Sequence, residues 1–154
     1  MRIHGGSTGI CRCEVGPSRH GCAPVSASLV IGENGARVRG YRDLVVWQLA
    51  MDLVVECYEL TRAYPITERY GLVSQIRRAA ISIPANIAEG RTRRSPKDFV
   101  RFIRIAEGSE AELETLIELS VRLDFLSAQD ATGLLNSYAK LARMLSRLRE
   151  RLAN

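Results

Sequence analysis

The sequence predicts an all-α fold, an up-down-up-down four-helix bundle, on two observations. From Tyr41 onward, apolar residues recur at alternating spacings of three and four over long stretches, which is the period of an amphipathic helix. Only short breaks separate these stretches, and short links place consecutive helices antiparallel to one another. The 154 residues, 46% hydrophobic and 25% charged, suit a single globular domain with a modest core.

Residues 1–40 differ in composition from the rest of the chain. They hold three of the four cysteines and both histidines, and they show no sustained helical or strand periodicity. We therefore expect a disordered tail, or upstream sequence translated from a start site assigned too early, before a domain over residues 41–154. Zinc-binding atoms occur in this segment, but their spacing lacks the paired C-x2-C knuckles of common zinc modules. The residues concerned are Cys11, Cys13, His20 and Cys22. Unpaired thiols in a tail are the favoured interpretation, and we expect no metal and no cofactor.

Charge and hydropathy restrict the class of protein only loosely. The formal charge of +5 and the isoelectric point near 9.3 permit an anionic partner such as nucleic acid without requiring one. No apolar run approaches the roughly 18 residues of a membrane span. The stretch 23–31 is too short and too serine-rich for the core of a signal peptide. We expect a cytoplasmic protein with no membrane association.

The first helix is predicted from Asp43 to Ala63, and Pro65 follows it as a stop signal. It is apolar on more than one face. One stripe consists of Leu44, Trp47, Met51, Val54 and Tyr58, and it is widened by Val45, Val46, Leu49, Leu53 and Val55. A helix with this much apolar surface needs more cover than a monomeric bundle provides, so we expect self-association. Cys57 lies among these residues and is expected to be a buried core thiol.

The second helix contains a proline. Its apolar stripe consists of Leu72, Ile76, Ala80, Ile83 and Ile87. Because the stripe crosses Pro84 without losing phase, the helix is expected to bend there rather than end. Ser82 is expected to cap a second segment, Ile83 to Glu89, and Gly90 to stop it.

A polar stripe runs beside the apolar one on the second helix. A buried unpaired polar group costs about 1–3 kcal/mol, so we expect these side chains to bond another helix or subunit. A solvated face on a surface helix is the alternative. The stripe consists of Gln75, Arg78, Ser82, Asn86 and Glu89. The residues with expected structural or interface roles are Trp47, Gln75, Ser82, Pro84, Asn86, Glu89 and Gly90.

The third helix is predicted to begin at Ser95, which can cap the exposed amides, with Pro96 in the first turn. A heptad seam follows, made of Phe99, Phe102, Ala106, Ser109, Leu113, Leu116, Ser120 and Leu123. The fourth helix, about Ala128 to Leu152, repeats the pattern with Leu134, Tyr138, Leu141, Leu145, Leu148 and Leu152.

Several segments in this order resemble a known family. They are "YRDLVVWQLAMDLV", "YPITERYGLVSQIRRAAISIPANIAEG", "FVRFIRIAEGSEAELETLIELS" and "LDFL". They are similar to the four-helix bundle proteins often encoded within intervening sequences of bacterial 23S ribosomal RNA genes. The resemblance covers residues 41–154 and implies protomers that associate as rings, typically pentamers, with no reaction attached. A related branch, the accessory proteins of diversity-generating retroelements, binds nucleic acid and a reverse transcriptase.

No enzyme signature accompanies the helices, so we expect a non-enzymatic protein. The histidines are confined to His4 and His20, and neither a G-x4-G-K loop nor an H-E-x-x-H pair is present. A face of the third helix carries Glu107, Glu110, Glu114 and Glu118. Di-metal bundles pair such glutamates with Glu-x-x-His motifs, which are absent here. A solvated acidic face is therefore expected, with no metal.

The predicted topology polarises the charge of the protomer. One end gathers eleven basic and four acidic side chains, a formal +7, whereas the opposite end carries a formal −6. Basic residues that open the third helix oppose its dipole, at about 0.3–1 kcal/mol each, which suggests that another interaction favours them. Solvated charge with some ion pairs between subunits is the alternative. The expected nucleic-acid contacts are Arg77, Arg78, Arg91, Arg93, Arg94, Lys97, Arg101 and Arg104.

These observations leave two functional hypotheses ahead of an enzyme. The first is a homo-oligomeric ring that binds RNA or DNA through its basic end. The second is an oligomeric adaptor for another protein, for example a reverse transcriptase, with no direct role in nucleic-acid binding.

Overall fold

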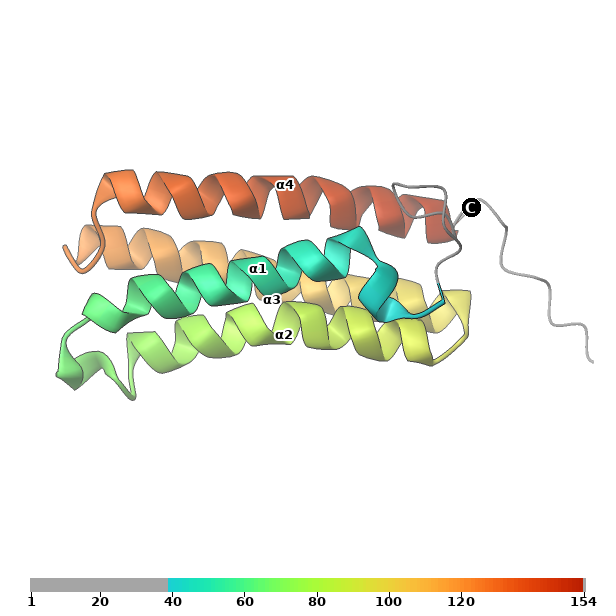
Figure 1. The fold of residues 1–154 in the computed structure, drawn as a ribbon, viewed down its shortest axis with the longest axis horizontal. Helices are drawn as coiled ribbons and strands as arrows, with labels where there is room; N and C mark the ends of the chain where they lie inside the picture. The colour runs from blue at the N-terminus through green and yellow to red at the C-terminus, as the bar shows by residue number, and fades with distance from the viewer. Residues whose placement is uncertain (1–38, 154) are drawn as a thin grey trace, which may run out of the picture.

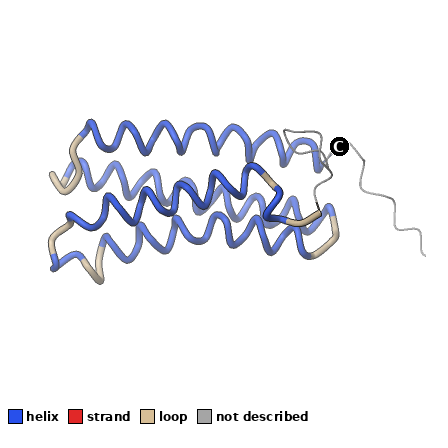
Figure 2. Tube along the Cα trace, in the orientation of Figure 1, coloured by secondary structure: helices blue, strands red, loops and turns tan. Residues whose placement is uncertain are grey.

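The computed structural model describes residues 39–153, and in this range it contains four long helices and no strand. They are α1 (Val45–Leu60), α2 (Leu72–Thr92), α3 (Pro96–Arg122) and α4 (Ala128–Ala153). Consecutive helices run in opposite directions side by side (Figure 1), and the connections lie at the two ends of the bundle (Figure 2). The predicted all-α fold is confirmed. The proposed tail, with its three cysteines and both histidines, lies outside the described residues apart from Arg39 and Gly40.

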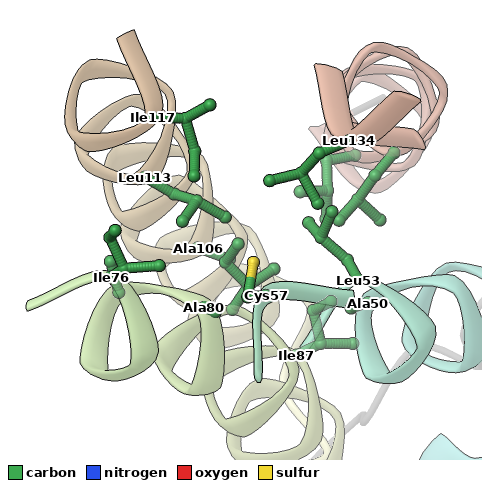
Figure 3. Packing of buried hydrophobic residues seen from close by; sticks show 14 of the residues in the cluster. Ala50, Leu53, Cys57, Ile76, Ala80, Ile87, Ala106, Leu113, Ile117 and Leu134 are labelled. Atoms are coloured by element: carbon green, nitrogen blue, oxygen red, sulfur yellow. The ribbon is translucent and has the colours of Figure 1, made fainter. Parts of the chain in front are cut away.

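The core lies between the four helices, each of which contributes buried apolar side chains (Figure 3). Cys57 is fully buried, as predicted, and burial raises the pKa of its thiol to about 12. The buried stripe of α1 differs from the predicted one, because Met51 and Tyr58 stay 39% and 37% exposed. The helix instead turns Val46, Ala50, Leu53 and Cys57 toward its neighbours. Part of its apolar surface therefore remains uncovered in the protomer.

Helix α2 continues through Pro84, which is buried, and ends at Thr92 rather than at Gly90. The prediction that Ser82 caps a second segment is wrong, because its hydroxyl instead contacts the Ser109 hydroxyl of α3 at 2.8 Å. Gly90 is not a stop signal either. A Cβ atom built on Gly90 would lie 2.6 Å from Cβ of Phe102, so its role is to let α2 approach α3. The helix actually ends before Arg94, whose φ of 56° is left-handed.

The predicted start of α3 is confirmed, because the Ser95 hydroxyl accepts a hydrogen bond from the Asp98 amide at 3.3 Å. Its predicted seam is confirmed in part. Phe102 and Leu116 are half-buried, and Leu123 is exposed because the helix ends at Arg122. The buried residues of the predicted α3 seam are Phe99, Ala106, Ser109, Leu113 and Ser120. Those of the predicted α4 seam are Leu134, Leu141 and Leu145.

Candidate nucleic-acid interface

The basic end of the bundle forms where α2 ends and α3 begins. The start of α1 and the end of α4 lie at the same end of the molecule, at the right of Figure 1, as the predicted topology requires. A short connection, Arg93 to Ser95, brings the arginines that close α2 next to those that open α3. The topology therefore gathers residues 91–104 in one region of the surface.

Lys97, Arg101 and Arg104 form a basic row along α3. Their spacings of four and three place them on one face of the helix, and all three are exposed. Among the ion pairs within residues 39–153, none involves a member of this row, nor Arg91 or Arg94. The row therefore presents three positive charges to solvent close to a helix N-terminus, where the backbone amides add positive potential.

Other arginines at this end are engaged within the protomer. Arg93 donates a hydrogen bond to Oε1 of Glu89 at 2.6 Å and lies over the Phe102 ring, and this carboxylate raises the pKa of the Arg93 guanidinium. Arg149 donates from Nε to Oε1 of Glu107 at 3.0 Å, which links α4 to α3. These two ion pairs neutralise part of the predicted positive charge, whereas the basic row and Arg94 make no ion pair within residues 39–153.

The structure does not bring Arg77 and Arg78 to the basic end. Arg77 precedes the last residue of α2 by fifteen positions, about 22 Å of helix. Its Nε donates to the Thr61 hydroxyl at 2.9 Å, and its guanidinium lies 4.4 Å from the centre of the Tyr58 ring. Arg78 pairs with Glu112 of α3 at 3.4 Å. Their inclusion in one site with residues 91–104 is therefore corrected, because they lie in the other half of the bundle.

The polar stripe of α2 makes the predicted bonds to another helix only in part: Ser82 and Arg78 bond α3 of the same protomer, whereas the other members bond residues of their own helix or its end. Ser82 meets Ser109, and the Asn86 amide donates to the Ser82 hydroxyl at 3.0 Å. Gln75 accepts from Arg78 at 2.7 Å. Trp47 is half-buried and stacks edge-on against Tyr41. Pro84 and Gly90 are buried in the protomer, so these two residues shape its packing rather than an outer surface.

The expected solvated acidic face of α3 is wrong for three of its four glutamates. Glu110 is only 4% exposed, and its Oε1 has no hydrogen-bond partner among the described residues. Burial, followed by the charges of Glu107 and Glu114, raises the pKa of the Glu110 carboxyl to about 8. Glu107 pairs with Arg149, and Glu114 accepts a hydrogen bond from the Tyr138 hydroxyl at 2.9 Å. These residues face α4, and only Glu118 lies on the exposed surface as predicted.

Two classes of site find no support within residues 39–153. No group of three or more histidine, cysteine, aspartate or glutamate side chains in this part of the chain is placed to hold a metal ion. None of the four helices is both long and apolar enough to cross a membrane.

Comparisons with known proteins agree on the family and the fold. The model of the family described as 23S rRNA-intervening sequence protein matches residues 42–147. A crystal structure from Bacteroides thetaiotaomicron, described as a protein with unknown function from the S23 ribosomal protein family, is similar with a TM-score of 0.60 and 25% sequence identity. The match covers 66% of this chain and 94% of that one. A search of curated proteins finds no match.

Proposed function

We propose that this chain, which belongs to the 23S rRNA-intervening sequence protein family, is a non-enzymatic cytoplasmic protein that forms a homo-oligomeric ring and binds RNA or DNA through its basic end. The observation that carries the binding role is the exposed row of Lys97, Arg101 and Arg104 without ion-pair partners in the described structure. Lys97 lies in the first turn of α3 and opposes the helix dipole, so its placement costs stability unless an anion uses it. Phosphate groups spaced along a nucleic acid are anions that suit such a row.

The ring is supported by apolar surface that the protomer leaves uncovered. Met51, Val55 and Tyr58 follow one another on one face of α1 at spacings of four and three, and Val55 is 53% exposed. Ile81 of α2 lines the same surface groove as Tyr58. Burying one such side chain contributes roughly 1.5–3 kcal/mol, so several could hold subunits together. A pentamer is the ring that the family resemblance implies.

The ring predicts a specific mass in solution. At micromolar concentration, multi-angle light scattering should give a single species several times the 17.1 kDa of the chain. A soluble, folded species of protomer mass would contradict the proposed assembly.

The binding role predicts the effect of replacing Lys97, Arg101 and Arg104 by glutamine. The triple variant should bind RNA and DNA at least about tenfold more weakly than wild type, because three phosphate contacts and their counterion release are lost. Replacing Arg62, Arg122 and Lys140 removes the same charge elsewhere and serves as the control. Fluorescence anisotropy with labelled RNA and DNA measures both. If both variants lost the same affinity, the loss would reflect net charge and not contacts made by the basic row.

Binding measurements on the wild-type protein also distinguish the adaptor hypothesis from this proposal. If wild type binds neither RNA nor DNA, while a partner such as a reverse transcriptase remains bound after nuclease treatment, the basic end does not act on nucleic acid.

A further inference from the structure

Two surface grooves of opposite charge lie in the half of the bundle away from the basic end. The first, which we call the arginine groove, has a volume of about 700 Å³ and runs between α1 and α2. All its charged lining residues are arginines, and aromatic and aliphatic side chains complete it: Arg69, Arg77, Arg78, Tyr58, Tyr70 and Ile81. Tyr70 is 86% exposed, and Arg69 lies over its ring. A groove of this kind fits a surface that combines carboxylates with apolar side chains.

The second groove, which we call the carboxylate groove, has a volume of about 490 Å³ and lies between α1 and the start of α4. All its charged lining residues are acidic, and apolar side chains again complete it: Glu56, Glu59, Asp130, Leu60, Phe125 and Leu134. The two grooves thus carry three charges each, of opposite sign, on similar apolar floors.

The grooves lie at the same height on the protomer. Helix α1 contributes Tyr58 to the arginine groove and Glu56, Glu59 and Leu60 to the carboxylate groove, all within five consecutive residues. They open on the two sides of α1 that face α2 and α4. In a closed ring, each protomer contacts its two neighbours through two different patches. Neighbours are related by rotation about the ring axis without translation along it, so the two patches must lie at the same height.

We propose that the arginine groove of one protomer receives the carboxylate-groove surface of the next copy of this chain. The proposal rests on the ring of the preceding section. In a four-helix bundle, the two faces that share α1 meet at about a right angle. Regular rings of four and five subunits need angles of about 90° and 108° between the two contacts of each protomer, which matches this arrangement.

The side chains of the arginine groove are free enough to make such contacts. Arg78 pairs with Glu112 across 3.4 Å, yet its side chain remains 70% exposed. Arg69 makes a cation–π contact but no ion pair within residues 39–153. Arg77 is held by Thr61 and Tyr58, so it supports the floor of the groove and is left unchanged in the test.

Charge reversal on either side tests the contact. One variant carries Arg69→Glu with Arg78→Glu, and the other carries Glu56→Arg with Glu59→Arg. Each should raise the dissociation constant of the assembly by about tenfold or more, because like charges then face each other. Analytical ultracentrifugation measures the assembly, and circular dichroism verifies that each variant is folded. Arg122→Glu with Lys140→Glu, which reverses two charges outside both grooves, should leave the assembly intact.

Mixing the two variants identifies which surfaces meet. Each mutated groove is repelled by its normal counterpart but attracted by the reversed groove of the other variant. An equimolar mixture should therefore reassemble into species that contain both chains, detected by native mass spectrometry. The two chains would alternate along the ring, so a five-membered ring would hold them three to two, with one unmatched junction. If both variants assemble as wild type does, or both dissociate and the mixture stays dissociated, the grooves do not face each other.

The outcomes also separate this inference from the proposed function. A wild-type protein that is monomeric contradicts the ring and this contact together. A wild-type ring that ignores both charge reversals overturns the contact alone. Nucleic-acid binding by the basic row is measured independently of either result.

Discussion

Gly90→Ala is expected to lower the free energy of unfolding by about 1–3 kcal/mol, even though alanine is the better helix former. The new Cβ atom would lie 2.6 Å from Cβ of Phe102 and 2.9 Å from Cδ2 of Phe99. Phe102 Cβ is fixed to the backbone of α3, so the clash is relieved only when α2 and α3 move apart. Chemical denaturation of the variant and of wild type measures the difference.

Gly108→Ala provides the matched control for this prediction. Gly108 also lies inside a helix, but nothing lies within 4 Å of a Cβ atom built there. Its replacement should raise the free energy of unfolding by about 0.5–1 kcal/mol through helix propensity alone. If both variants were stabilised equally, close packing at Gly90 would not be its role.

Glu110→Gln is expected to stabilise the protein more strongly as the pH rises. The folded-state pKa of Glu110 is raised from 4.5 to about 8, so the folded protein holds a proton that the unfolded chain releases above pH 4.5. Wild type therefore loses stability between about pH 4.5 and 8, while glutamine stays neutral throughout. By pH 9 the gain should be on the order of 2–4 kcal/mol, since one pKa unit corresponds to about 1.4 kcal/mol.

Denaturation midpoints measured from pH 4 to pH 9 check this dependence. Glu118→Gln, on the exposed surface of the same helix, should stay within about 0.5 kcal/mol of wild type at each pH. Parallel pH profiles for wild type and Glu110→Gln would show that the carboxyl ionises normally in the folded protein.

The helices could be predicted from the sequence, but the register of α3 could not. Two apolar seams share Phe99, Ala106, Leu113 and Ser120 and diverge between them. The predicted seam includes Phe102 and Ser109, which pack against α2. The other seam includes Ile103 and Glu110, which are buried toward the core and α4. Because α3 packs against two neighbours, it buries parts of both. A prediction based on one seam alone therefore placed Glu110 on the exposed surface.

The other corrections have the same physical origin, contacts between residues distant in sequence. Gly90 has the pattern of a helix stop, and only the approach of Phe99 and Phe102 from α3 reveals its role. Arg77 lies fifteen residues before the end of α2, and only the structure reveals that it contacts Thr61 and Tyr58 in the other half of the bundle. Local signals, such as the cap at Ser95, were predicted correctly because they depend on neighbouring residues alone.

The salt dependence of nucleic-acid binding tests the central claim, that the basic row of Lys97, Arg101 and Arg104 contacts phosphates. A plot of log affinity against log salt concentration loses about 0.9 of slope for each phosphate contact removed from duplex DNA. The triple glutamine variant should therefore show a slope shallower than that of wild type by about 2–3, with the assembly intact by light scattering. An intact assembly with wild-type affinity and wild-type slope would contradict the claim.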